Sequence, residues 1–350
     1  MRTMIVLGAV LCGVAPAALA QTAQRYPIAG DNVAIYNLAG TVRVEGGSGS
    51  AVVVEVTRGG ADAGTLEVAT GPIGGRQTLR VIYPDHDIIY RDLGGHSSSS
   101  LDVRDDGTFN GNTRESGRGH RVRIRGGGSG TEAHADLRIV VPPGKQVAVY
   151  LAVGRMTATN VSGDLTLDVS AADVTANGIR GALIVDAGSG DVRVSDVTGS
   201  LNLDTGSGNV TVSGIQGDEI LLDTGSGDVT LDRAEVRSLN IDTGSGNADA
   251  TAVKADNLTI STGSGNVTLV LLAGGGTINI DTGSGEVIAT LPADYGADVL
   301  LDTGSGDIDL GSIPVTVRRI EENHVEGRIG DGRGRLQIET GSGGVRLRKA

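Results

Sequence analysis

The pentapeptide Asp-Thr-Gly-Ser-Gly recurs through the second half of this sequence, and its spacing constrains the fold more than any other feature. It starts at residues 204, 223, 242, 281 and 302, with close variants at 186, 261 and 339. The central serines are 18, 19, 19, 19, 20, 21 and 37 residues apart, and the last interval is close to two periods. Such a period is typical of a solenoid, in which each repeat packs on its neighbours.

Alternating apolar residues flank each copy. Leu201 and Leu203 precede the turn at 204–208, and Val210 and Val212 follow it. A period of two indicates β-strands that bury one face. We therefore predict an all-β protein, a β-solenoid similar to a parallel β-helix, with two-strand coils of about 19 residues.

Stacked coils would align like residues in ladders about 4.8 Å apart. The repeat gives two inner ladders. The first is Leu183, Leu201, Ile220, Leu239, Leu258, Ile278 and Val299, and the second is Val192, Val210, Val229, Val267, Val287 and Ile308. A weaker copy at 165–174 places the start of the array near residue 140.

Asp-Thr-Gly-Ser is also the active-site signature of pepsin-like aspartic proteases, which need two such loops that share one proton. Eight copies in one array cannot each be half of such a pair. Turn chemistry explains the motif better, because Gly206 and Gly208 permit unusual backbone angles, Ser207 can bond nearby main chain and Asp204 can cap the turn. We interpret each copy as a corner of the solenoid.

Four sections are predicted along the chain. Residues 1–20 have the features of a cleaved signal peptide, with Arg2, an apolar stretch and Ala18-Leu19-Ala20 at its end, and Cys12 lies within it. Residues 21–83 are expected to form a β-rich N-terminal section, residues 84–133 a flexible insertion or extended hairpin, and residues 134–350 the repeat solenoid. The signal implies export to a periplasmic, cell-surface or secreted location.

Charge and composition exclude some functions. The formal net charge of −13 argues against binding nucleic acid or anionic lipid by bulk charge, and no apolar run after the signal is long enough to span a membrane. With no Trp and one Phe, the core must be thin and built from Val, Ile, Leu and Thr.

Two sets of charged residues are candidate sites. The basic candidates for partner binding are Arg114, Arg118, Arg121, Arg123 and Arg125, which could contact a polyanion, although arginines on an edge strand also deter unwanted strand pairing. The acidic candidates for a calcium ladder are Asp204, Asp223, Asp242, Asp228, Asp302 and Asp307. Solvated turn caps are the alternative for these carboxylates, and no other cofactor is expected.

The repeat TGSGDV, the segment ADLRIVVPPGKQVAVYLAVGRM at 135–156 and the segment VEGRIGDGRGRLQIETGSGGVRLRK at 325–349 resemble the bacterial "putative adhesin" domains of unknown function. The resemblance spans about 30–350 outside the insertion, and it implies a β-solenoid in an exported or envelope-linked protein. We therefore expect a non-catalytic structural or interaction protein of the cell envelope that offers a repetitive surface to a glycan or surface polymer. The alternatives are a periplasmic enzyme that acts on polysaccharide and a calcium-stabilised scaffold.

Overall fold

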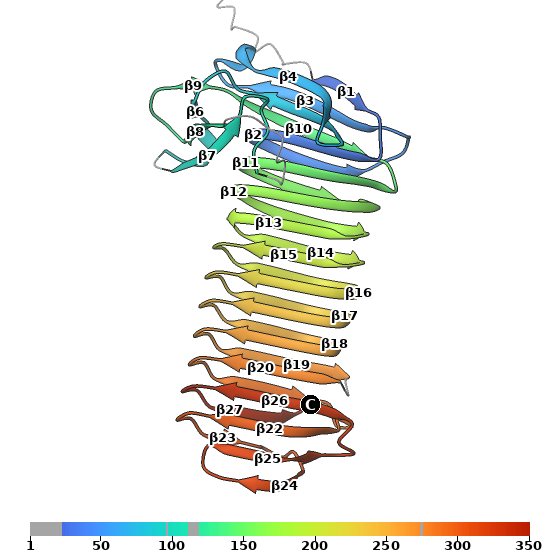
Figure 1. Ribbon diagram of the computed structural model, residues 1–350, viewed down its shortest axis with the longest axis vertical. Coiled ribbons are helices and arrows are strands. Elements are labelled where there is room, and N and C mark those ends of the chain that lie inside the picture. The colour runs from blue at the N-terminus through green and yellow to red at the C-terminus, as the bar shows by residue number, and fades with distance from the viewer. Residues whose placement is uncertain (1–22, 96, 111–118, 274–275) are drawn as a thin grey trace, which may run out of the picture.

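A computed structural model describes residues 23–95, 97–110, 119–273 and 276–350. Within these residues the helices are two short 3-10 turns, η1 (Ala63–Thr65) and η2 (Arg91–Leu93). The strands stack along a rod, with the N-terminal section at one end and the last strands of the chain at the other (Figure 1). The predicted all-β solenoid is confirmed.

Each regular coil places one segment before the Gly-Ser-Gly corner and one after it. The segments before the corner form a first parallel sheet, and those after it form a second. The strands of the regular array are β12 (Gly163–Arg180), β13 (Leu183–Ser189), β14 (Val192–Thr198), β15 (Leu201–Thr205), β16 (Val210–Thr224), β17 (Val229–Thr243), β18 (Ala248–Thr262), β19 (Val267–Ala273), β20 (Thr277–Thr282) and β21 (Val287–Leu291). The longer strands, such as β17, continue through both sheets because the parallel pairing with neighbouring coils resumes directly after the second corner of the coil.

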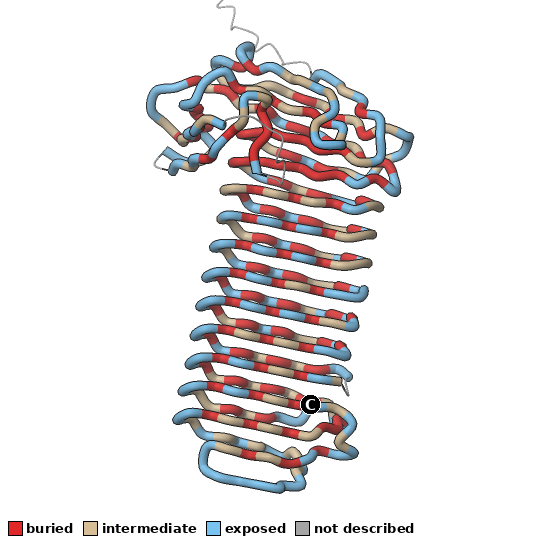
Figure 2. Tube along the Cα trace, viewed as in Figure 1, coloured by how far each residue is buried: buried red, intermediate tan, exposed pale blue. Residues whose placement is uncertain are grey.

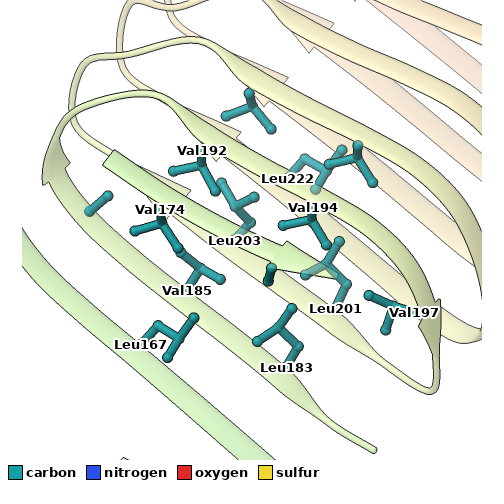
Figure 3. Packing of buried hydrophobic residues seen from close by; sticks show 14 of the residues in the cluster. Leu167, Val174, Leu183, Val185, Val192, Val194, Val197, Leu201, Leu203 and Leu222 are labelled. Carbon is teal, nitrogen blue, oxygen red and sulfur yellow. The ribbon is translucent and has the colours of Figure 1, made fainter. Parts of the chain in front are cut away.

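The apolar ladders pair in the predicted register through the regular array. Leu201 lies opposite Ile220, and Ile220 lies opposite Leu239. On the other sheet Val192 pairs with Val210 and Val210 with Val229. These side chains interdigitate between the two sheets (Figure 3), and buried and exposed positions alternate along each strand (Figure 2).

From β11 to β18 the second corner of each coil contains one residue in the left-handed conformation. These residues are Asn160, Gly178, Asp196, Gly214, Arg233 and Ala252, with φ between 53° and 68°. Gly and Asn adopt this conformation readily, whereas Arg233 and Ala252 adopt it against their preference. The corner is therefore imposed by the stack and does not depend on the local residue.

The coils at the C-terminal end do not follow sequence order, which corrects the predicted ladder. β26 (Gly334–Thr340) lies between β20 and β22 (Ala297–Thr303), so Leu336 separates Ile278 from Val299. β27 (Val345–Lys349) separates β21 from β23 (Ile308–Asp309) in the same way. The hairpin of β24 (Val315–Ile320) and β25 (His324–Ile329) pairs antiparallel on the far side of β22.

The N-terminal end is interleaved as well. β2 (Asn32–Gly46) lies between β10 (His134–Val141) and β11 (Lys145–Thr159), which are consecutive in the chain. Beyond β2 the first sheet continues with β5 (Arg76–Ile82) and β4 (Glu67–Ile73). The second sheet continues beyond β10 with β3 (Val52–Gly59) and β1 (Gln24–Ile28).

The predicted insertion contains a separate four-stranded sheet at the side of the N-terminal end (Figure 1). Its strands are β6 (Asp87–Ile89), β7 (Ser98–Arg104), β8 (Gly119–Arg125) and β9 (Thr131–Glu132). β8 pairs with β7 on one side and with β6 on the other. The expectation that the arginine-bearing strand is an edge strand is therefore wrong.

Candidate functional site

A buried threonine organises the Gly-Ser-Gly corner. The hydroxyl of Thr243 accepts a hydrogen bond from the backbone N–H of Gly246 at 3.1 Å and donates to the carbonyl of Gly227, one coil earlier, at 3.0 Å. Thr224, Thr262, Thr282 and Thr340 make the same two bonds. Sequence reasoning gave this role to the serine and the aspartate, although the threonine recurs in all copies except the one at 186.

Close stacking explains the second glycine of the corner. A Cβ atom on Gly227 would lie 1.8 Å from the carbonyl oxygen of Gly208, and one on Gly246 would lie 1.9 Å from that of Gly227. Any side chain here would force successive coils apart. In these copies the glycine is required by the approach of the backbone from the preceding coil.

The residue after the corner forms a continuous hydrogen-bonded column, which we call the turn column. Its members are Asp173, Asp191, Asn209, Asp228, Asn247, Asn266 and Glu286. Each side-chain oxygen from Asp173 to Asn266 accepts the backbone N–H of the next member, as from Asn247 to Asp228 at 2.8 Å. The column therefore caps one backbone donor per coil, and Asn serves as well as Asp.

A second row of carboxylates lies on the outer face of the first sheet, and we call it the aspartate column. In spatial order its aspartates are Asp168, Asp186, Asp204, Asp223, Asp242, Asp281 and Asp302, with Ser261 and Glu339 at two positions between them. Burial raises the pKa of Asp223, and the carboxylates of Asp204 and Asp242 raise it further. The column is a line of like charges held at strand spacing.

The candidate calcium ligands are divided between the two columns. Asp204, Asp223, Asp242 and Asp302 belong to the aspartate column, whereas Asp228 and Asp307 follow the corner. Within the part of the chain that the structure describes, no group of three or more His, Cys, Asp or Glu side chains could hold a metal ion. Calcium binding stays a prediction.

Aromatic side chains of the insertion and the first coils cover the N-terminal end of the aspartate column. Tyr36 and Tyr150 stack with ring centroids 4.4 Å apart, and Phe109 meets Tyr36 edge-on at 5.8 Å. Asn110 donates a 2.7 Å hydrogen bond to Asp168. Burial raises the pKa of Asp168 to about 6, with a further contribution from Asp186.

This cluster brings aromatic rings beside carboxylates, as a sugar-binding site would, but the rings are not accessible. Tyr36, Tyr150 and Phe109 are 4%, 6% and 0% exposed. Their faces contact one another, so they cannot stack on a sugar ring. We interpret the cluster as the contact that fixes the insertion on the solenoid, and no sequence signal links Phe109 to the two tyrosines.

His324 closes the C-terminal end of the aspartate column. Its Nδ1 lies 2.6 Å from a carboxylate oxygen of Asp302, across the antiparallel pair β22–β25. Asp298 of β22 forms ion pairs with Arg328 of β25 and Arg318 of β24, whose guanidinium groups lower its pKa, Arg328 most. The free carboxylates therefore lie in the middle of the column, between two ends that are satisfied by neighbours.

The basic candidates are largely neutralised by their neighbours. Arg125 lies 3.1 Å from Asp87, and Arg121 contacts Asp102 at 3.9 Å and Ser100 at 2.9 Å. Arg123 lies 4.0 Å from Asp87 and, like Arg121, is largely exposed. Arg114 and Arg118 lie outside the described residues. The row therefore offers little free positive charge, and its role in partner binding stays a prediction.

Two hollows on the described surface lie toward the ends of the rod. One of about 370 Å³ is lined by Asp298, Arg318, Glu326 and Arg335, whose charges are mostly paired with one another. Another of about 280 Å³ is lined by Arg43, Glu55 and Arg138. Because a carboxylate in an ion pair with arginine is a poor general acid, neither hollow resembles a glycosidase site.

Comparison with known proteins identifies the repeat region. Residues 177–348 match the family described as Toastrack DUF4097, a domain of unknown function, which confirms the predicted family over a shorter stretch than expected. One similar solved structure is a "putative cell adhesion protein" from Clostridium sporogenes, 11% identical, covering 94% of this chain and 100% of that chain, with a TM-score of 0.22. A TM-score this low supports no argument about fold or partner. No curated protein matches the chain.

No helix among the described residues is long and apolar enough to cross a membrane. The corner threonines, the turn column from Asp191 onward and nearly all of the interleaved last coil lie within the matched residues. This repeat region of the chain, residues 177–348, is a Toastrack DUF4097 domain.

Proposed function

We propose that this protein is exported by a cleaved signal peptide over residues 1–20 and acts, without catalysis, as a structural or interaction protein of the bacterial cell envelope. In this proposal residues 134–350 form the repetitive binding unit, residues 21–83 close its N-terminal end and residues 84–133 are an insertion beside it. The signal lies outside the described residues, so its support is the sequence pattern alone.

The observation that carries the proposal is the outer face of the first sheet. Beside the aspartate column runs a second outward row at the same strand spacing, in which amide and apolar side chains are mixed: Ile184, Asn202, Leu221, Asn240, Thr259, Asn279 and Gln337. Carboxylate and amide groups are suited to hydrogen bonding with sugar hydroxyls. A polymer with repeated units can contact several coils at once, so weak single contacts would combine into useful avidity.

Sedimentation tests this proposal. Purified full-length protein would be mixed with whole bacterial cells and with isolated envelope fractions, with and without EDTA, and the pellet would be assayed. We expect retention by the envelope material. Retention that EDTA abolishes would assign the carboxylates to bound calcium, and protein that stays wholly in the supernatant would contradict an envelope partner.

Matched variants locate the surface. Replacing Asp204, Asp223 and Asp242 together by Ala removes the polar groups from three adjacent coils of the aspartate column and should reduce retention at least tenfold, because the contacts act together. Replacing Thr211 and Thr230 by Ala changes exposed positions on the second sheet and should have no effect. Equal losses in both variants would count against the first sheet as the binding face.

A further inference from the structure

The two ends of the rod differ in how they expose strand edges. At the N-terminal end the outermost strands β1 and β4 contain Pro27 and Pro72, which cannot donate to a further strand. At the C-terminal end the last strand of the first sheet is β24, which contains no proline. Among the described strands β24 pairs with β25 alone, so its second edge is free.

The first sheet also extends beyond the second at this end. The second sheet ends at β23, which has two residues, whereas β25 and β24 continue the first sheet. Val315 still packs against the core, but Val317 and Ile320 have no opposite wall. Val317 is 41% exposed, and Ile320 is 64% exposed, the largest value for a large hydrophobic residue in the described part of the chain.

Charges are arranged symmetrically around Ile320. The sequence from 318 to 322 reads Arg-Arg-Ile-Glu-Glu. A two-fold axis at Ile320 would place Arg319 opposite Glu321 of a second copy, and Arg318 opposite Glu322 of that copy. Within one chain Arg319 already pairs with Glu321 at 2.7 Å, and Arg318 pairs with Asp298 and Glu326. The antiparallel segment is complementary in charge to itself when the Arg319–Glu321 pair is exchanged between the two copies.

We propose that Val317 to Glu322, here called the tip surface, binds the tip surface of a second copy of this chain, so that two rods join end to end through a two-fold axis. A β-bulge at Arg318 limits main-chain pairing to the end of β24, so side chains carry most of the contact. The contact is small, and we expect a reversible dimer of micromolar or weaker affinity. Because the N-terminal edge strands contain proline, we do not propose that the tip surface binds the N-terminal end of another copy to form head-to-tail filaments.

Analytical ultracentrifugation of the full-length protein over a wide concentration range tests the proposal. We expect a monomer–dimer equilibrium that Ile320→Asp weakens at least tenfold, because a buried charge replaces the central apolar contact. Leu272→Asp is the matched control, since Leu272 is 62% exposed on the side of the rod and should leave the equilibrium unchanged. Circular dichroism should show the same fold in both variants.

Charge exchange identifies the partner as a second tip. Arg318→Glu with Arg319→Glu leaves only acids from 318 to 322, and Glu321→Arg with Glu322→Arg leaves only bases. Circular dichroism must show the wild-type fold for the first of these, because Arg318 also pairs with Asp298 and Glu326 within the chain. Each double variant should be monomeric alone, and a mixture of the two should form a heterodimer. The variant with all four changes restores self-complementarity and should dimerise.

Three outcomes would overturn the proposal. They are a wild-type monomer at all concentrations, a dimer that persists in Ile320→Asp, and double variants that do not recover association when mixed. Growth into species larger than a dimer would show that another surface mediates association. The result is independent of any envelope partner, because it requires no ligand.

Discussion

The aspartate column and the turn column carry similar residues five positions apart in the same coils, yet their side chains do different things. In the turn column each oxygen accepts a backbone N–H from the next coil, and Asp and Asn alternate freely. In the aspartate column the middle carboxylates have no such donor, and burial and mutual repulsion raise the pKa of Asp186 and Asp223. The turn column holds the stack together, whereas the aspartate column places charge on its surface at some expense in stability.

The largest effect should come from the corner that separates the two columns. Thr243→Val keeps the side-chain shape but leaves the N–H of Gly246 without its acceptor and the carbonyl of Gly227 without its hydroxyl donor. We expect a loss of about 2–4 kcal/mol in the free energy of unfolding, measured by urea denaturation. Thr230→Val, on the exposed outer face, is the control and should change it little. Equal effects would show that the buried bonds are unimportant.

The next effect concerns the covered end of the aspartate column. Asp168→Asn keeps an oxygen that can accept from Asn110 and removes the buried charge. Because the pKa of Asp168 is raised to about 6 in the folded protein, the contribution of this carboxyl to stability is fully present below the unfolded value of 3.8 and is lost as the pH rises to about 6. The variant should lack this loss and be more stable at neutral pH by about 2 kcal/mol, after allowance for partial exposure.

Thermal denaturation between pH 4 and 8 would measure this difference. Asp228→Asn, in the turn column, provides the control, because Asn occupies equivalent positions of that column in the native chain. Identical pH profiles for wild type and Asp168→Asn would contradict a raised pKa at this carboxyl.

A smaller loss is expected when the turn column is interrupted. Asp228→Ala removes the acceptor for two hydrogen bonds, from the backbone N–H and the side-chain amide of Asn247. We expect a loss of about 1 kcal/mol, whereas Asp228→Asn should change stability by less than about 0.5 kcal/mol. Hydrogen exchange of the Asn247 amide would test the local effect, and unchanged protection in Asp228→Ala would count against the cap.

These differences mark the limit of prediction from the sequence. Alternation and the repeat give the two sheets and the register of residues such as Leu201 and Ile220, because burial permits only one register once one face is apolar. The sequence pattern does not predict the position of the last coil, which consists of β26 and β27. Leu336 fits between Ile278 and Val299 because all coils share the same pattern, so nothing local distinguishes one slot from the next.

The candidate site, like the fold, could be predicted from the sequence only in part. The sequence identifies both rows of acids, since the period aligns them, but it cannot tell which oxygen meets a backbone donor one coil away. It gave the cap to Asp204, whereas the hydrogen bonds belong to the threonine and to the turn column. The contact of Phe109 with Tyr36 depends on how the insertion at 84–133 packs against the first coils, and no local sequence pattern predicts that packing.

The smallest effect should come from the middle of the aspartate column. Asp242→Asn removes one of the two carboxylates that, after burial, raise the pKa of Asp223. We expect the pKa of Asp223 to fall toward its ordinary value and the free energy of unfolding at neutral pH to rise by no more than about 0.5 kcal/mol. An NMR titration of the Asp223 carboxyl together with thermal denaturation would measure both. If Asp242→Asn instead destabilises the protein strongly, and EDTA destabilises the wild type equally, then a bound cation compensates the column, because repulsion alone cannot make the loss of a charge costly.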